Sequence, residues 1–415
     1  MNVLQVNYTD VMGRRFNGGA LASWLQSHGH YARQAVSVKQ STSPESISLV
    51  PTRISRVTES LAYRVRKVED VLGVHNVLYP QSFLLPFNQA FKDADVIHYH
   101  IIHNQFFSYL ALPWLTRKKP SVWSLHDPWA LTGHCIHPLD CEGWKSGCNP
   151  CPHLDYPFPL RRDTAALNFK LKSFSYRNSK MHLVVASRWM QRLVEQSPLL
   201  GQFPLHLIPF GLNLDIFSPG EKQAAKVKLG LSADRLVIGM RALEGSFKGF
   251  EYALKAIELL PAELPVQILT CQRTGMFSRI NGKFPVHEMG EIEGDEAMVE
   301  FFHATDVHLM PSMAESFGMM AMEAAACGVP SVVFDGTPLP DICFAPLGGL
   351  AVPRGDANAL SDALYRLVTD SGLRERMGFK ARELAEANYG FDRYAKSMVE
   401  VYEQAMASHS ENAKL

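Results

Sequence analysis

The sequence predicts an α/β protein built from two consecutive doubly wound, Rossmann-like domains. Short β-rich runs alternate with helical patterns along almost the whole chain, which is typical of parallel sheets covered by helices. A chain of 415 residues is too long for one hydrophobic core. Its composition, with 47% apolar and 20% charged residues, is ordinary for a globular protein. These observations together favour two domains of the same class.

Four predicted strands lie in the first half of the chain. They are NVLQVN (2–7), DVIHYH (95–100), SVWSLH (121–126) and HLVVAS (182–187). Helical patterns follow the first and the last of them, and Ser187 is a candidate N-cap because its hydroxyl can accept from first-turn amides. The first domain is therefore expected over residues 1–207.

A second alternation begins near residue 205. Its predicted strands are LHLIPF (205–210), LVIGMR (236–241), VQILTC (266–271), VHEMG (286–290), DVHLMP (306–311) and SVVFD (331–335). Pro, Gly and Asn residues in IPFGLNLDIFSPG (208–220) interrupt both periodicities and mark the joint. The second domain is expected over 208–390. Residues 391–415 should form a helix that packs back on the first domain, followed by a disordered polar tail from residue 408.

Charge is distributed unevenly along the chain. The formal net charge is zero, but residues 1–200 hold 22 Lys/Arg against 13 Asp/Glu, and residues 201–415 hold 19 against 28. The N-terminal residues lack the order of a signal peptide, and no apolar run approaches the roughly 20 residues that span a bilayer. We expect a cytoplasmic protein with no nucleic-acid partner.

A basic segment in the first half is a candidate contact with the inner face of a membrane. Residues 160–180 carry six cations against the single acid Asp163, interleaved with leucine and phenylalanine. The cations are Arg161, Arg162, Lys170, Lys172, Arg177 and Lys180. Each cation near an anionic membrane contributes on the order of 1 kcal/mol. A solvated helix face explains the same pattern, and both interpretations stay open.

Two glutamates stand in a segment that otherwise has the composition of a protein interior. The run MPSMAESFGMMAMEAAACGVPSVVFD (310–335) places Glu315 in a loop after a predicted strand and Glu323 in a helix that Gly318 opens. Such loops border ligands in open parallel sheets, and a buried carboxylate needs donors such as sugar hydroxyls. Backbone N–H groups that could form an anion site here are those of Phe317, Gly318 and Met319. The structural alternative is that Glu323 pairs with a buried Arg or caps a neighbouring helix.

With this glutamate pair the sequence resembles the retaining glycosyltransferases of family 4. The family signature is a Glu, seven residues and a second Glu, written here ESFGMMAME. The resemblance implies the GT-B fold, in which two Rossmann-like domains face a central cleft. It also implies that Glu315 and the following amides hold the sugar and diphosphate of a nucleotide donor, and that Glu323 binds the ribose.

Further segments carry the same resemblance. The run LIPFGLNLDIFSP is similar to the interdomain segment of the family, and VIGMRALEGSFKGFEYALKAIELL is similar to its phosphate-binding turn. That turn would supply Arg241 and Lys248, whose charges suit a diphosphate leaving group. Two solvated cations beside a helix start are the alternative explanation.

The first half has its own counterparts of family motifs. The run MGRRFNGGALASWL is similar to the glycine-rich first loop, where Gly18 and Gly19 would let the backbone approach the donor closely. The family has a histidine that contacts the donor sugar near the reacting carbon, and His126 in WSLHDPWALTGHC matches it. A plain loop-to-helix turn and a structural histidine explain the same residues. Three further histidines in IHYHIIH remain unassigned.

The resemblance implies transfer of a hexosyl group from a UDP- or GDP-linked sugar to a glycan or lipid-linked glycan, with retention of configuration. The catalytic residues would be His126, Arg241, Lys248 and Glu315. No catalytic metal is expected, because the GT-B fold does not usually need one. Similar proteins typically build bacterial surface polysaccharides. The alternatives are a nucleotide-sugar epimerase of the same fold and a metal-centred binding or redox protein.

The metal-centred or redox alternative is based on a cysteine cluster. The run HCIHPLDCEGWKSGCNPCPH (134–153) contains Cys135, Cys141, Cys148 and Cys151, four of the seven cysteines in the chain. Two thiolates in a Cys-x-x-Cys loop can grip one tetrahedral ion, and the other two could complete a sulfur-only shell. We expect a structural zinc that braces this loop and takes no part in the chemistry. Redox-active thiols or reduced packing residues remain the alternatives.

Overall fold

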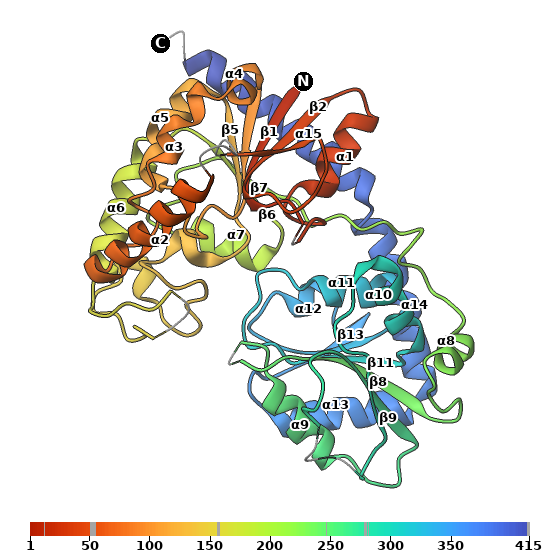
Figure 1. Ribbon diagram of the computed structural model, residues 1–415. Helices are drawn as coiled ribbons and strands as arrows, with labels where there is room; N and C mark the ends of the chain where they lie inside the picture. The colour runs from red at the N-terminus through yellow and green to blue at the C-terminus, as the bar shows by residue number, and fades with distance from the viewer. Residues whose placement is uncertain are drawn as a thin grey trace. The chain divides into compact units, whose positions relative to one another are not determined.

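The computed structural model (Figure 1) describes residues 1–11, 13–49, 55–155, 158–245, 247–277, 280 and 282–412, leaving aside the side chains of 55–62 and 412. The chain divides into two compact units. Unit 1 comprises Met1–Gly211 and Asp392–Leu415, and unit 2 comprises Leu212–Phe391. The chain passes from unit 1 to unit 2 at residues 211–212, within the Pro- and Gly-rich segment.

Unit 1 is built on a seven-stranded sheet in the order β3-β2-β1-β4-β5-β6-β7, with parallel pairing throughout. The strands are β1 (Asn2–Thr9), β2 (Tyr31–Val38), β3 (Ser46–Ser48), β4 (Val96–Tyr99), β5 (Ser121–Ser124), β6 (His182–Val185) and β7 (Leu205–Leu207). The strand order reverses between β1 and β4. Open α/β sheets bind ligands at such a reversal, beyond the carboxyl ends of the strands.

Three strand assignments differ from the prediction for unit 1. The sequence analysis missed β2 and the three-residue strand β3. The apolar pattern of β2 is interrupted by Gln34, which is buried and donates from Nε2 to the carbonyl oxygen of Asn17 at 3.2 Å. The run at 205–207 was assigned to the second alternation, but as β7 it pairs with β6 and ends the first sheet.

Helices cover the sheet of unit 1 (Figure 1). They are α1 (Gly19–Ser27), α2 (Ser55–Leu72), α3 (Gln81–Leu84), α4 (Gln89–Asp93), α5 (Leu112–Lys118), α6 (Ala165–Arg177), α7 (Arg188–Glu195) and α15 (Phe391–Asn412), with 3-10 turns η2 (Leu85–Phe87), η3 (Tyr109–Ala111), η4 (Pro128–Leu131) and η5 (Gly143–Lys145). The predicted N-cap of α7 is confirmed, since Ser187 Oγ accepts from Met190 N at 3.2 Å.

The last helix, α15, is fastened to unit 1 by polar contacts. His98 Nδ1 lies 2.8 Å from Tyr402 Oη, and His182 Nε2 lies 3.2 Å from Ser408 Oγ. The expected disorder from residue 408 is wrong up to residue 412, because the helix continues to Asn412. His409 Nε2 contacts the carbonyl oxygen of Arg117 at 3.2 Å, which gives the polar residues of the tail a partner.

Unit 2 is built on a six-stranded parallel sheet in the order β10-β9-β8-β11-β12-β13. The strands are β8 (Leu236–Ala242), β9 (Val266–Gln272), β10 (Val286–Glu288), β11 (Val307–Met310), β12 (Ser331–Phe334) and β13 (Gly349–Val352). The helices are α8 (Lys222–Lys228), α9 (Phe250–Leu259), α10 (Gly294–Ala304), α11 (Met319–Ala326), α12 (Leu339–Ile342), α13 (Ala357–Thr369) and α14 (Ser371–Asn388). The reversal falls between β8 and β11, so the loops after these strands flank the expected ligand crevice.

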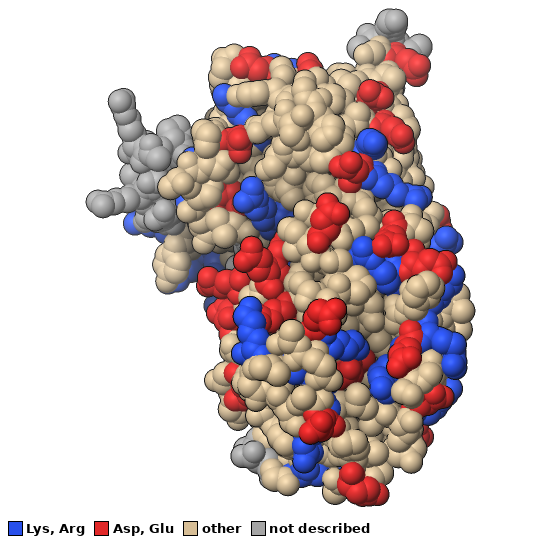
Figure 2. All heavy atoms as spheres, turned by 90° about the vertical axis from the view of Figure 1, so that its right-hand side faces the viewer, with Lys and Arg blue, Asp and Glu red and all other residues tan. Residues whose placement is uncertain are grey.

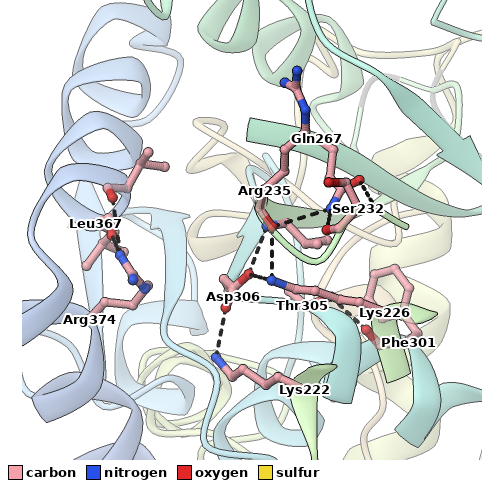
Figure 3. A network of polar contacts seen from close by, with 12 residues as sticks. Lys222, Lys226, Ser232, Arg235, Gln267, Phe301, Thr305, Asp306, Leu367 and Arg374 are labelled. Carbon is pink, nitrogen blue, oxygen red and sulfur yellow. Dashed lines mark hydrogen bonds and ion pairs between the residues drawn. The ribbon is translucent and has the colours of Figure 1, made fainter. Parts of the chain in front are cut away.

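A charged network stabilises unit 2 at the amino end of β11 (Figure 3). The carboxylate of Asp306 contacts Lys222 Nζ at 3.1 Å and Lys226 Nζ at 2.8 Å, and it accepts from Val237 N at 2.9 Å. Burial acts to raise the pKa of Asp306, but the two ammonium groups and the hydrogen bonds hold it below its usual value. The network lies at the amino ends of the strands, opposite the carboxyl ends that flank the expected ligand crevice, so its role is structural.

Side chains of both charge signs are interleaved over the face that Figure 2 presents. Helix α14 carries two ion pairs, Lys380 with Glu383 at 2.6 Å and Arg382 with Glu386 at 2.7 Å. No helix in the described ranges is both long and apolar enough to cross a membrane.

Candidate active site

Two loops of unit 2 meet at the strand-order reversal. After β8, the carbonyl oxygen of Phe247 accepts from Met313 N at 2.8 Å in the loop after β11. Gly249 has φ +66°, and a Cβ there would stand 1.8 Å from the carbonyl oxygen of Pro311. Only glycine therefore allows the loops to approach so closely. The approach brings Lys248 Nζ to 2.6 Å from Glu315 Oε1, both side chains being partly buried.

Helix α11 begins beside this ion pair. Gly318 has φ +108°, and its carbonyl oxygen accepts from Ala321 N at 3.1 Å to close the first turn. A Cβ at Gly318 would lie 2.3 Å from Leu339 Cδ2, so packing as well as φ requires glycine. Phe317 is buried against the ring of Tyr389, so only its main chain is available to a ligand. With Met319 as its first residue, the helix directs its positive end toward the loop that holds Glu315.

Glu323 lies inside the protein on α11, with 2% of its surface exposed. Burial raises the pKa of the Cys271 thiol to about 11, and the charge of Arg241 lowers it while that of Glu323 raises it further. Arg241 and Glu323 therefore act on the same buried region at the carboxyl ends of β8 and β9. The Nε of Arg241 is buried and has no hydrogen-bond partner among the residues that the structure describes.

Helix α11 ends at Ala326, just before Gly328. Gly328 adopts φ +72°, its N–H donates to Ala325 at 3.0 Å, and Val329 N donates to Ala324 at 2.9 Å. These bonds satisfy carbonyls of the last turn and turn the chain into β12.

In unit 1, the glycine-rich loop after β1 packs against a group of histidines. Gly18 has φ +92°, and a Cβ there would lie 1.5 Å from Gln5 Oε1 and 2.6 Å from His100 Nε2. A Cβ at Gly19 would lie 2.7 Å from Arg14 Cγ. These two glycines thus serve packing within unit 1 whatever else they contact.

His126 follows β5 and is enclosed by rings. Its Nε2 lies 3.1 Å from His100 Nδ1, its ring stacks on Phe210 at 5.7 Å, and Phe16 packs at 5.6 Å. Burial lowers the pKa of His126 to about 4, and the nearby charge of Asp127 only partly opposes this. His126 is therefore a neutral hydrogen-bonding group near pH 7. The sequence did not single out His100, Phe16 or Phe210 as its neighbours.

Asp127 anchors the turn after His126. It accepts from Trp129 N at 2.9 Å and contacts His103 Nε2 at 3.0 Å. Burial acts to raise the pKa of Asp127, but His103 and the Trp129 amide hold it below its usual value. The ring of His103 also stacks on Trp129 at 5.0 Å. Two histidines that the sequence left unassigned, His100 and His103, thus orient the strand end that carries His126.

The cysteine loop is folded so that its thiols lie near one another. Burial raises the pKa of Cys135 to about 12, and Cys151, Cys148 and Cys141 each raise it further. His134, which the sequence analysis did not consider, lies with Nε2 at 3.3 Å from Cys151 Sγ and 3.7 Å from Cys135 Sγ. Among the described residues, no three His, Cys, Asp or Glu side chains are arranged to hold a metal ion. The zinc site stays a prediction.

One cation of the basic segment lies inside unit 1, which corrects its predicted exposure. Lys172 on α6 is 1% exposed, and its Nζ donates to the carbonyl oxygens of Trp129 at 2.6 Å and Thr132 at 2.9 Å. The ammonium also lies 3.5 Å from the centre of the Trp129 ring. Burial lowers the pKa of Lys172 to about 7. It braces the start of the cysteine loop and cannot face a membrane.

Comparison with known proteins supports one enzyme class. Residues 284–384 match a family model described as glycosyl transferases group 1. The D-inositol 3-phosphate glycosyltransferase of Corynebacterium jeikeium is 26% identical over 332 residues, covering 76% of this chain and 74% of that protein. Its namesake in Mycobacteroides abscessus is 23% identical over 409 residues, covering 94% and 86%. A match to the Xylanimonas cellulosilytica protein of that name is 29% identical over 222 residues and covers 48% of this chain and 51% of that protein.

Solved structures share the whole fold. Sucrose-phosphate synthase from Thermosynechococcus elongatus superposes with a TM-score of 0.66 at 18% identity, covering 98% of this chain and 100% of that one. Anabaena HepE in complex with UDP gives a TM-score of 0.67 at 13% identity, covering 97% and 100%. WaaG, a glycosyltransferase involved in lipopolysaccharide biosynthesis, gives 0.64 at 16%, covering 95% and 98%.

The two parallel Rossmann-like sheets and these structural neighbours define the GT-B fold. The chain is a glycosyltransferase. The part that matches the glycosyl transferases group 1 model, residues 284–384, includes Glu315, Gly318 and Glu323.

Proposed function

We propose that this chain is a retaining glycosyltransferase of family 4 that moves a hexosyl group from a nucleotide diphosphate sugar to an acceptor hydroxyl. Unit 2 would hold the donor and unit 1 the acceptor. The observation that carries the proposal is the 2.6 Å contact of Lys248 and Glu315 at the strand-order reversal of unit 2, beside the start of α11.

Charge on the leaving group explains this set of residues. Negative charge develops on the diphosphate as the glycosidic bond breaks, and fixed positive groups stabilise it without a metal ion. Lys248, Arg241 and the N-terminus of α11 would supply these groups at the expected crevice of unit 2. Glu315 would then accept hydrogen bonds from sugar hydroxyls, and Glu323 from the ribose.

A reaction on one face of the sugar would explain both where the acceptor proton goes and why the anomeric configuration is retained. The acceptor oxygen bonds to the anomeric carbon on the side from which the diphosphate departs, and a phosphate oxygen takes the acceptor proton. No side-chain base is required. His126, which is neutral near pH 7, would donate or accept one hydrogen bond to the donor sugar.

The acceptor is proposed to be a carbohydrate or polyol, as a glycan or a lipid-linked glycan in bacterial surface polysaccharide or glycolipid synthesis. The name of WaaG refers to lipopolysaccharide biosynthesis, and several relatives are named for D-inositol 3-phosphate. HepE has been solved with UDP, which makes UDP-linked donors the first to test.

The deciding experiment is a screen of UDP- and GDP-linked hexoses with and without mixed glycan acceptors. Released nucleotide and the anomeric configuration of the product, followed by NMR, report the activity. A product of retained configuration supports the proposal. Inversion, or an epimerised nucleotide sugar formed without acceptor, would exclude it.

Peripheral membrane contact is proposed for the exposed part of the basic segment. Phe174 and Leu167 on α6 are exposed at 65% and 45%, and Lys170 and Arg177 are exposed beside them. Co-sedimentation with vesicles of anionic phospholipid tests it. Binding should fall with added salt and with Phe174→Ser, and no binding at low salt would refute it.

A further inference from the structure

A cavity in unit 1 is unused by the donor chemistry described above. It has a volume of about 670 Å³, a size typical of small-molecule sites. Its lining includes Tyr8, Arg66, His75, Gln105, Phe158 and Arg161. Aromatic rings, an amide and two guanidinium groups in the lining are suited to a carbohydrate that carries negative charge.

The position of the cavity in the sheet favours a ligand site. Tyr8 belongs to the end of β1, and Gln105 lies in the loop that follows β4. The strand order of unit 1 reverses between these two strands. The cavity therefore opens where doubly wound sheets bind ligands, independently of the donor crevice of unit 2.

Three residues in or next to the cavity lining have strained backbone conformations. Phe158 and Gln105 line it with φ +67° and +59°, and Asn76, next to His75, has φ +60°. Such conformations are costly for residues other than glycine and persist only where the surroundings enforce them. Asn76 shows that enforcement, because its Oδ1 accepts from Gln105 N at 2.9 Å and its Nδ2 donates to His103 O at 2.9 Å.

A buried histidine atom lacks a protein partner at the same place. His75 is 4% exposed, and its Nε2 has no hydrogen-bond partner in the described part of the chain. Its ring meets the edge of Phe158 at 6.0 Å, and its main-chain N–H is fixed by Asn168 Oδ1 at 3.2 Å. A buried polar atom without a partner is costly, and a ligand group would satisfy it.

The two arginines supply the charge. Neither Arg66 on α2 nor Arg161 forms an ion pair within the described ranges. Asp70 is the acid on the cavity wall, one helical turn from Arg66. Two guanidinium groups leave the wall positive, and each can fork onto a phosphate or carboxylate. Asp70 can accept from a hydroxyl of the same ligand.

The cavity wall is connected to the residue proposed to touch the donor sugar. Asn76 holds the carbonyl oxygen of His103, and His103 Nε2 contacts Asp127 at 3.0 Å. Asp127 directly follows His126 in the chain. The hydrogen bonds that shape the cavity thus also fix the position of His126.

We propose that this cavity is the acceptor subsite and that it selects a carbohydrate or polyol bearing an anionic group, a phosphate monoester or a carboxylate. The proposal rests on the transferase function proposed above. Arg66 and Arg161 bind the anion, His75 Nε2 and Gln105 contact hydroxyls or the anion, and Tyr8 and Phe158 pack against the ring.

Direct binding to the full chain tests the subsite without any turnover. Glucose 6-phosphate, glucuronate and glucose serve as probes in calorimetric titrations, and UDP reports the donor site separately. We expect the two anions to bind at least tenfold more tightly than glucose. Arg66→Gln with Arg161→Gln should remove that preference and leave UDP binding unchanged. Arg192→Gln, at an exposed position on α7, is the matched control.

Kinetics give the second arm of the test. With an anionic acceptor, the double variant should raise KM for the acceptor at least tenfold, while kcat and acceptor-free donor hydrolysis change little. Preference for glucose 6-phosphate over glucuronate assigns the anion as a phosphate, and the reverse assigns a carboxylate. Equal binding of glucose and both anions, or an unchanged preference in the double variant, overturns the subsite. Absence of nucleotide release with every donor would instead overturn the transferase proposal.

Discussion

The carbonyl oxygen of Phe247 accepts a hydrogen bond from Met313 N at 2.8 Å, tying the loop after β8 to the loop after β11. These two strands are neighbours in the sheet although more than sixty residues separate them in the chain. The contact between Lys248 and Glu315 is therefore set by main-chain geometry as well as by charge. A side-chain substitution at Lys248 should leave the loop in place.

Lys248→Ala should reduce kcat/KM for transfer by about 10²–10³, the usual cost of losing one group that stabilises transition-state charge. The folded structure should be retained, because the side chain is partly exposed and the loop is held by main-chain bonds. Steady-state kinetics with the thermal midpoint measured in parallel check this. Lys255→Ala, at an exposed position on α9, is the control. Near-normal turnover of Lys248→Ala at subsaturating donor would contradict the assignment.

Glu323→Gln should weaken nucleotide binding by roughly 10- to 100-fold, because a hydrogen bond to a charged group contributes about 1.5–3 kcal/mol. Gln has nearly the same side-chain volume as Glu. The substitution therefore leaves no void that would itself destabilise the protein, whereas Glu323→Ala would leave one. Both variants should lose most of the transfer activity. Titration with UDP measures the effect. If Glu323→Gln bound UDP like the parent chain, the residue would have a packing role alone.

Acid should destabilise the fold through its buried histidines. Burial lowers the pKa of His98 to about 3 and that of His126 to about 4, against an unfolded value near 6.5. Below pH 6.5 the unfolded chain therefore binds more protons than the folded one. The stability that these neutral rings contribute is complete above pH 6.5 and is lost as pH falls toward the folded pKa values.

Urea unfolding at pH 8, 6 and 5 measures this dependence. His98→Gln can keep hydrogen bonds to Tyr402 and Ser124 but has no proton to gain, so its unfolding free energy should vary less between pH 8 and 5. His28→Gln alters an exposed ring and is the control. The same pH slope in His98→Gln and the parent chain would show that His98 does not contribute.

The sequence predicted the architecture better than it predicted the environment of individual residues. Strands such as β4 and β12 are continuous buried runs, so their pattern is unambiguous. Strand β2 was missed because its buried Gln34 obtains a partner, Asn17, only through the tertiary fold. Lys172 was interpreted as a surface cation for the same reason, since its carbonyl acceptors come from a segment some forty residues earlier.

For the candidate sites too, motifs of consecutive residues were predictable and contacts between distant segments were not. The motif around Glu315 and Glu323 was recognisable because its loop, glycine and helix are consecutive in the chain. The cavity of unit 1 was not predicted, because Arg66, Gln105 and Arg161 come from three distant segments. The histidines that the sequence left unassigned, His98, His100 and His103, are not in its lining, and no spacing rule relates them to Arg66 or Arg161.

The last prediction concerns the cysteine loop. Purified chain should contain one zinc ion, which the four thiols would bind after rotating toward a common point as they lose their protons. Without metal, burial raises the pKa of Cys148 to about 11, so its thiol is neutral near pH 7. Cys148→Ser should lose the metal and lower the thermal midpoint, with nucleotide binding in unit 2 unchanged. Cys343→Ser, at a buried cysteine of unit 2, should keep the metal. Elemental analysis and thiol labelling with and without a chelator measure both effects. Active protein that contains no metal and whose four thiols all react freely would rule out the zinc and leave Lys172 and the packing of Trp129 and Trp144 as what holds the loop.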